Sequence, residues 1–147
     1  MTRLLAVATE GVRIPVALAR VERVGDAVLR AEGVGEAVVS ITFVTSRRMA
    51  ALNVKHLGHR GPTDVISFGF AATGKGSPVT GDIYICPAVA REHALAHGNG
   101  IREELLRLVV HGVLHIIGYE HPTDESRTTS PMWRRQEVLL RRALKAG

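Results

Sequence analysis

The sequence has very little cysteine: Cys86 is the only one among 147 residues. A single thiol cannot form a disulfide within the chain and fits a reducing compartment, so we expect a cytoplasmic protein with Cys86 as a small buried hydrophobe at the end of a strand. An uninterrupted apolar run is also missing near the N-terminus, because Glu10, Arg13 and Arg20 separate its apolar residues. We therefore expect neither a signal peptide nor a membrane span. The length predicts one domain over residues 1–147.

Charge is distributed unevenly along this chain, whose formal net charge is +5. Residues 45–62 contain basic side chains and no acid, and residues 127–147 contain many arginines against Glu137 alone. Residues 82–125 are instead rich in acids. Basic segments on both sides of an acidic one favour a polyanionic partner such as a nucleic acid. The alternative is that they form ordinary solvated faces of an arginine-rich protein.

Hydrophobic periodicity predicts about four strands and about five helices. The strands are expected at residues 4–8, where the strand would lie at a sheet edge, and at residues 37–45, 64–70 and 80–86. The helices are expected at residues 16–31, 46–57, 87–97, 101–117 and from 131 onward. Pro15 is expected to open the first helix and Ser46 to cap the second. Because the two kinds of element do not alternate strictly, we expect an α+β domain with one small mixed sheet.

Residues 111–121, HGVLHIIGYEH, combine residue types and spacing that folding alone does not explain. Helical residues four apart differ by about 40° around the axis, so His111 and His115 project from one face on successive turns. Gly118 can take the left-handed conformation that ends a helix, after which the chain can return His121 as a third ligand. Three histidines leave one tetrahedral position open, as in catalytic zinc sites. We predict a metal site at the end of a buried helix.

The helix at residues 101–117 is apolar on nearly every side, which predicts burial almost all round. There an imidazole without a partner costs about 1–3 kcal/mol. One core histidine is usually satisfied by a backbone or carboxylate hydrogen bond, but two at this spacing, followed by a third, favour a metal. His93 and His97 share the spacing, yet no third histidine follows Gly98. They are expected to be an exposed pair that needs no partner.

The histidine spacing is also that of the metzincin proteases, H-E-x-x-H-x-x-G-x-x-H. In those enzymes the glutamate acts as general base on the zinc-bound water, whereas this chain has Gly112 at that position. The sequence therefore argues against peptide hydrolysis by that route. Glycine within a helix costs up to about 1 kcal/mol relative to alanine, so we expect Gly112 to let a substrate or a neighbouring backbone come close.

Three segments resemble the YbeY-type endoribonucleases, the bacterial ribosomal RNA maturation factors. Residues 111–121 are similar to the family's H-G-x-L-H-L-x-G-[YH]-D-H, with Glu120 in place of the aspartate. Residues 62–68, PTDVISF, resemble P-T-D-V-L-S-F, and residues 81–86, GDIYIC, resemble G-D-I-x-I-C. The order and separation of these segments also agree, so that the resemblance extends over residues 52–121.

This resemblance implies a zinc-dependent endoribonuclease, with one ion per chain, that acts on single-stranded ribosomal RNA. It implies a function in maturation, notably of the small-subunit 3′ end, and in ribosome quality control, with the ribosome or assembly factors as partners and no membrane. His111, His115 and His121 would be the zinc ligands. Where the family commonly has an arginine after L-N-x-x-[YF], this chain has Leu57, and Arg60 is the basic residue of the same loop that can supply the charge.

Arg60 and Glu120 are the candidate catalytic residues beside the ligands. As a hypothesis, the metal polarises a phosphoryl oxygen and lowers the pKa of its water, while Arg60 holds a phosphate. Glu120 would carry a proton or orient a ligand, and its alternative is an ordinary surface carboxylate. The residues leave open whether water or the RNA's own 2′-hydroxyl attacks. Two other functions remain open: a non-catalytic assembly or RNA-binding factor stabilised by the metal, and a zinc metalloprotease.

Overall fold

The structure, a computed structural model, describes residues 2–70, 77–120 and 128–146. Within them the chain forms a single four-stranded sheet and five helices. The strands are β1 (Arg3–Thr9), β2 (Ala37–Phe43), β3 (Val65–Phe70) and β4 (Val79–Ile85). The helices are α1 (Leu18–Ala31), α2 (Ser46–Leu57), α3 (Pro87–His97), α4 (Ile101–Ile117) and α5 (Pro131–Lys145). The expected α+β class and mixed sheet are confirmed.

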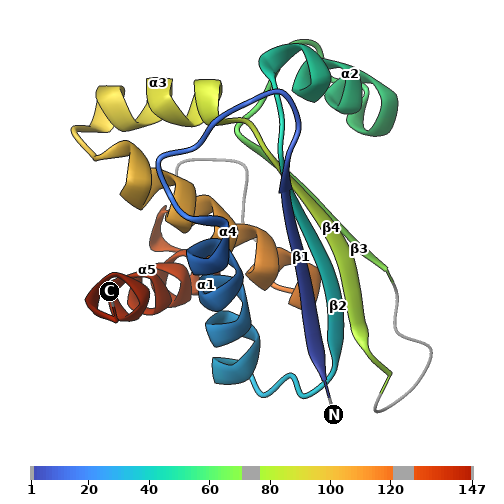
Figure 1. Cartoon of the computed structure of the whole chain (residues 1–147), viewed down its shortest axis with the longest axis vertical. Coiled ribbons are helices and arrows are strands. Elements are labelled where there is room, and N and C mark those ends of the chain that lie inside the picture. Colours follow the sequence, from blue (N-terminus) through green and yellow to red (C-terminus); the bar gives the residue numbers. More distant parts are fainter. Residues whose placement is uncertain (1, 71–76, 121–127, 147) are drawn as a thin grey trace.

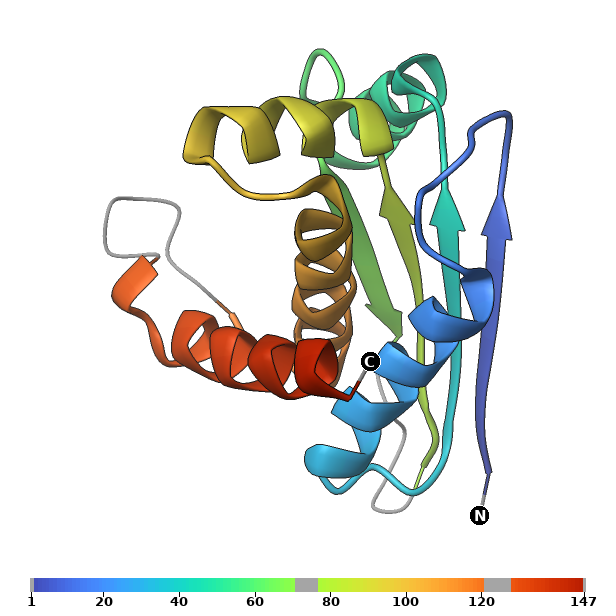
Figure 2. The same ribbon diagram turned by 60° about the vertical axis from the view of Figure 1, so that its left-hand side comes forward.

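The sheet has the strand order β1-β2-β4-β3. Strands β1, β2 and β4 run parallel, and β3 pairs antiparallel with β4. Strand β1 lies at an edge, as expected. The helices α1, α4 and α5 lie on one face of the sheet, while α2 lies beyond one end of it (Figure 1). The second view shows α4 alongside the sheet and α5 running across α4 (Figure 2).

Two clusters of buried side chains hold the elements together. The larger one joins the sheet to α1, α4 and α5, and includes Ile41, Ile83 and Val113, all 0% exposed. The smaller one lies under α2 and α3 and includes Met49 and Cys86. The burial of Cys86, just after β4, is confirmed. Among the helices described, none combines the length and the apolar composition that crossing a bilayer requires.

Two predicted helix starts are wrong. Pro15 does not open α1, because Ala17 is extended, with φ −63° and ψ 137°, and acts as the N-cap of a helix that begins at Leu18. Ser46 does not cap α2, because it is already helical, and the capping hydroxyl belongs to Thr45. The Thr45 Oγ1 atom accepts a hydrogen bond from the Arg48 backbone N–H at 3.1 Å. In both cases the N-cap is the residue directly before the observed helix, Ala17 or Thr45, and that residue has the extended backbone that a cap requires.

Gly112 lies where α4 packs on β4. A Cβ atom placed on Gly112 would lie 2.8 Å from Cγ2 of Ile83, which is closer than packed carbon atoms come. The neighbour that requires the glycine is therefore a side chain of the sheet, and not the substrate or backbone expected from the sequence. The same contact means that a glutamate could occupy this position only after a shift of Ile83.

Replacing Gly112 with alanine is expected to destabilise the protein, although alanine favours a helix by up to about 1 kcal/mol. The extra methyl group must displace Ile83 in a packed core, which costs about 1–3 kcal/mol. Thermal unfolding should show a Tm lower by several degrees. The matched control is Gly100→Ala, because a Cβ at Gly100 meets no atom within 4 Å. An unchanged Tm for Gly112→Ala would mean that α4 is not held at this spacing from the sheet.

Candidate metal centre

Helix α4 carries His111 and His115 on successive turns of one face, as the spacing predicts. Their ring centroids are 5.8 Å apart, and the ring planes are inclined by 73°. The expected burial is wrong, however: His111 is half-buried and His115 is exposed. Helix α4 is buried mainly where it contacts the sheet, α1 and α5, and the histidine face turns away from that core. The desolvation cost expected from the sequence therefore does not apply to His115.

A buried glutamine orients His111. The Nδ1 atom of His111 lies 2.7 Å from Oε1 of Gln136, and Nε2 of Gln136 donates to Oε2 of Glu137 at 3.1 Å. Because a carboxylate only accepts, the Gln136 amide turns its oxygen toward His111, and that oxygen accepts a hydrogen bond from the N–H of His111 Nδ1. The lone pair of the ring is then on Nε2. This is the tautomer in which histidines commonly bind metals.

A backbone carbonyl orients His115 in the same way. Its Nδ1 atom lies 2.9 Å from the carbonyl oxygen of Tyr119, which can only accept, so the lone pair of this ring is also on Nε2. Gly118, with φ +121°, makes the turn that brings Tyr119 back over the end of α4. The Tyr119 hydroxyl donates to Oε2 of Glu32 at 3.1 Å, and Arg135 Nε donates to Oε1 of Glu32 at 2.6 Å. The carbonyl that positions His115 is thus tied to the end of α1.

The environment of Tyr119 favours its neutral hydroxyl. Partial burial, the hydrogen bond to Glu32 and the negative charge of Glu32 raise the pKa of Tyr119 above its usual value. The positive charge of Arg135 acts in the opposite direction but is outweighed. Tyr119 therefore serves as a hydrogen-bond donor that holds the turn after α4, rather than as an ionised group.

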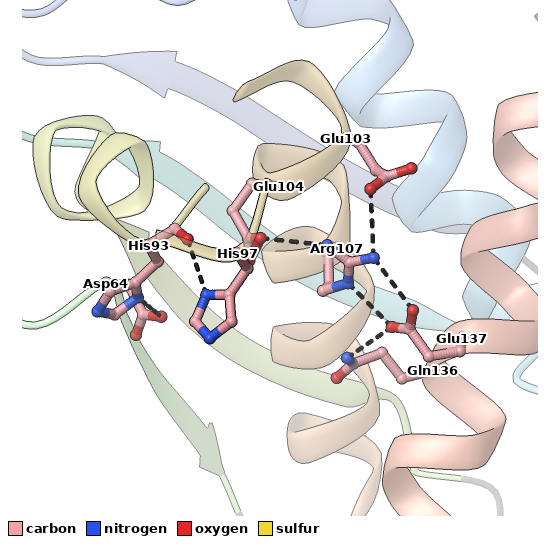
Figure 3. A network of polar contacts seen from close by, with 8 residues as sticks. All are labelled: Asp64, His93, His97, Glu103, Glu104, Arg107, Gln136 and Glu137. Carbon is pink, nitrogen blue, oxygen red and sulfur yellow. Dashed lines mark hydrogen bonds and ion pairs between the residues drawn. The ribbon is translucent and has the colours of Figure 1, made fainter. Parts of the chain in front are cut away.

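Arg107 anchors the opposite end of the histidine face. Its guanidinium donates to Glu137 Oε2 at 3.0 Å, to Glu104 Oε2 at 3.1 Å and to Glu103 Oε2 at 3.4 Å (Figure 3). Burial opposes the charged forms. The hydrogen bond and the charges of the three acids nevertheless raise the pKa of Arg107, and the hydrogen bonds from Arg107 and Gln136 lower the pKa of Glu137. Glu137 thus accepts from both Arg107 and Gln136, which links the ion pairs to His111.

The role of Gln136 was not predicted from the sequence, although the sequence contains an indication that this residue makes a polar contact. Gln136 is 1% exposed and lies four residues after Met132, which is also buried, on the inward face of α5. A polar side chain at a buried helical position must find a hydrogen-bond partner. That position therefore indicated a polar contact beneath α5, although it did not say that the partner is His111.

The remaining predicted site residues are not brought to the histidine pair by any described contact. His121 lies outside the described residues. Glu120 is exposed just after the end of α4. Arg60 is exposed in the loop between α2 and β3, where Asn53 Nδ2 donates to the Gly61 carbonyl at 2.8 Å and so fixes the adjoining backbone. Among the described residues no three His, Cys, Asp or Glu side chains are grouped to hold a metal ion.

A pocket of about 260 Å³ lies beside His111, between α3, α4, α5 and the start of β3. His93 and His97 line it, and both are exposed, as expected. The Nδ1 atom of His93 lies 3.1 Å from Oδ2 of Asp64, and Nδ1 of His97 donates to the His93 carbonyl at 2.8 Å (Figure 3). Asp64 belongs to a segment distant in sequence, so a pattern along one helix does not reveal this pairing.

Two histidines on one helix face, each with Nδ1 engaged as a donor, fit a metal ion that binds through Nε2. Such a pair, together with one more protein ligand, can hold a zinc ion whose fourth coordination position stays open.

Comparisons with known proteins agree on one family. A protein-family model described as "Endoribonuclease YbeY" matches residues 9–143. The protein named "Endoribonuclease YbeY" from Geobacillus kaustophilus is 40% identical over 113 residues, covering 71% of this chain and 71% of that protein. The protein of the same name from Frankia alni is 41% identical over 113 residues, covering 69% of this chain and 61% of that protein.

A solved structure shares the fold. The solution structure of a protein from Thermotoga maritima superposes with a TM-score of 0.65 over 97% of this chain and 91% of that chain. The two sequences are 24% identical, so this likeness concerns the fold alone.

Proposed function

Because this chain belongs to the YbeY endoribonuclease family and is therefore an RNA-cleaving hydrolase, we propose that it cleaves single-stranded RNA with a zinc ion held by His111, His115 and His121. Its substrate is ribosomal RNA, in maturation of the small-subunit 3′ end and in ribosome quality control. The ribosome or its assembly factors are its partners, and it works in the cytoplasm. Residues 1–147 act as one catalytic domain.

The observation that carries the proposal is the common orientation of the two described histidines. In each ring Nδ1 donates to a fixed acceptor, Gln136 Oε1 at 2.7 Å or the Tyr119 carbonyl at 2.9 Å. Such outer partners set the tautomer and the direction of metal-binding histidines. A zinc ion bound here would supply a Lewis acid able to polarise a phosphoryl oxygen and to lower the pKa of its water. His121, as the third ligand, would leave a coordination position for the substrate.

Arg60 and Glu120 act around this centre in the proposal. Arg60, exposed on a loop tied down through Asn53 and Gly61, holds a phosphate of the RNA by charge. Glu120, exposed beside the end of α4, carries a proton to or from the reacting oxygens.

A metalloprotease has less support than a nuclease. The general base of the metzincins would stand at Gly112, where even a Cβ atom would come within 2.8 Å of Ile83. A glutamate fits there only if the packed side chain of Ile83 shifts. The packing of α4 on β4 therefore disfavours the protease mechanism at this histidine pair.

Arg60→Ala is expected to lower kcat/KM for RNA cleavage by roughly threefold to tenfold, because one phosphate contact is lost. The slope of the logarithm of RNA affinity against the logarithm of salt concentration should also become shallower by about one unit. The zinc content should stay unchanged. Cleavage of a single-stranded RNA at several salt concentrations measures both effects. Arg30→Ala, in the last turn of α1, is the matched control for loss of one exposed arginine. Equal salt slopes in Arg60→Ala and the unmodified protein would remove Arg60 from RNA binding.

A further inference from the structure

The pocket beside His111 has walls that suit an uncharged ligand better than a phosphate. Arg107 is the only arginine or lysine among its described lining residues. The guanidinium of Arg107 is already neutralised by ion pairs with Glu103, Glu104 and Glu137 at 3.0–3.4 Å. Asp64 and Glu104 add negative charge to the lining. A phosphate would meet carboxylates here without a cation left to balance them.

Four side chains of these walls present hydrogen-bond acceptors: His93, His97, Asp64 and Glu104. Nδ1 of His97 donates to the His93 carbonyl, so Nε2 of the neutral His97 ring is an acceptor. His93 Nδ1 faces the Asp64 carboxylate at 3.1 Å, which makes Nε2 the acceptor of that neutral ring too. Asp64 and Glu104 contribute only acceptors. The ligand that complements such walls carries N–H donors.

The pocket also has an aromatic wall. Trp133, in the first turn of α5, is half-buried and lines it. Trp133 belongs to neither cluster of buried side chains in the described part of the chain, so its ring is not needed to fill the core. Aromatic side chains at RNA sites stack on unpaired bases. A volume of about 260 Å³ has room for a single base, and is too small for a longer segment of RNA.

We propose that this pocket binds one unpaired nucleobase bearing an exocyclic amino group, which stacks on Trp133 and donates to the acceptors of His97, His93 and the neighbouring carboxylates. The preference is for cytosine over uracil, because the two differ in an amino group against a carbonyl oxygen at one ring position. His111 lines the pocket, so a base held there places the adjoining phosphate at the metal centre. The inference rests on the proposed function for its substrate class.

Fluorescence tests the pocket without relying on cleavage, because Trp133 is the only tryptophan of the chain. The zinc-loaded protein is titrated with cytidine 3′-monophosphate and with uridine 3′-monophosphate, which share the same phosphate and ribose. Cytidine monophosphate is expected to quench Trp133 and to bind about tenfold more tightly than uridine monophosphate. His97→Ala should reduce that ratio to about twofold or less, since it removes one acceptor. Leu95→Ala, 77% exposed on the same helix, is the control and should keep the ratio.

Cleavage of matched single-stranded oligonucleotides provides the second measurement. Oligonucleotides that differ only by cytosine or uracil next to the cut should be cleaved at rates about tenfold apart. Trp133→Ala should remove the preference, and Trp133→Phe should retain most of it, because phenylalanine still stacks on a base. Circular dichroism of both variants shows whether they are folded.

The results separate this inference from the proposed function. If RNA is cleaved with no preference and neither nucleotide quenches Trp133, the pocket inference is overturned while the nuclease stands. If cytidine monophosphate quenches selectively but zinc-dependent cleavage is absent, the pocket stands and the nuclease proposal fails. Tighter binding of uridine monophosphate would overturn the assignment of the walls as acceptors.

Discussion

His115→Ala is expected to give a folded protein that has lost its zinc and nearly all of its RNA cleavage. The side chain is exposed, so its removal leaves no cavity in the core and should change stability little. Loss of a residue that merely orients a ligand typically costs about 10–100-fold in metal affinity or activity. Loss of a ligand should exceed this, so we expect cleavage to fall by at least about 100-fold.

Metal analysis and RNA cleavage should be measured on the same preparations, at neutral pH and without chelator. The unmodified protein should carry about one zinc per chain, and His115→Ala less than about half an equivalent. The matched control is His56→Ala, which removes an exposed histidine of α2 whose ring packs on Phe68, with centroids 4.7 Å apart. That variant should keep both its zinc and its cleavage.

The same variant separates the nuclease from its main alternative. A folded His115→Ala protein that lacks zinc yet still binds ribosomal RNA and supports maturation would favour an assembly factor without catalysis. A variant that retains both zinc and cleavage would show that His115 is not a ligand. Chelator-sensitive cleavage of casein, with no cleavage of RNA, would instead restore the protease.

Arg107→Leu is expected to lower the free energy of unfolding by about 3–5 kcal/mol at neutral pH. The Arg107 side chain is 13% exposed, and the side chains of Glu104 and Glu137 are 10% and 23% exposed. Removing the arginine leaves these carboxylates close together with little water and without the guanidinium that bonds them both. The penalty comes from those uncompensated charges and does not equal the worth of the ion pairs themselves. Urea denaturation monitored by circular dichroism measures the loss.

Two further variants identify the cause of that loss. Adding Glu137→Gln to Arg107→Leu should recover part of the stability, because it removes one of the stranded charges. Arg134→Leu, which removes an exposed arginine of α5, should change the free energy of unfolding by no more than about 0.5 kcal/mol. If the double variant is no more stable than Arg107→Leu, the loss arises from packing of the arginine's aliphatic part instead.

Local patterns in the sequence predicted the elements well, because each pattern depends on contacts between near neighbours in the chain. The helices α3 and α4 were predicted at their observed bounds, since a proline or glycine marks their ends. The same kind of reasoning was wrong at Pro15 and Ser46, because the N-cap residues of these two helices are Ala17 and Thr45. It was also wrong about the burial of His115, because an apolar sequence does not tell which side of a helix the neighbouring elements leave open.

The sequence by itself determined the fold class and the pair of histidines on one helix face, because periodicity and helical geometry are properties of consecutive residues. It also carried the family resemblance, which the comparisons confirm. Only the tertiary structure decided what surrounds the histidines: Gln136 beneath His111, Glu32 behind Tyr119, and Asp64 beside His93. These contacts join residues 25, 87 and 29 positions apart in the chain. Nothing in the spacing of residues along the chain indicates them, because they exist only once α1, α3, α4 and α5 are packed together on the sheet.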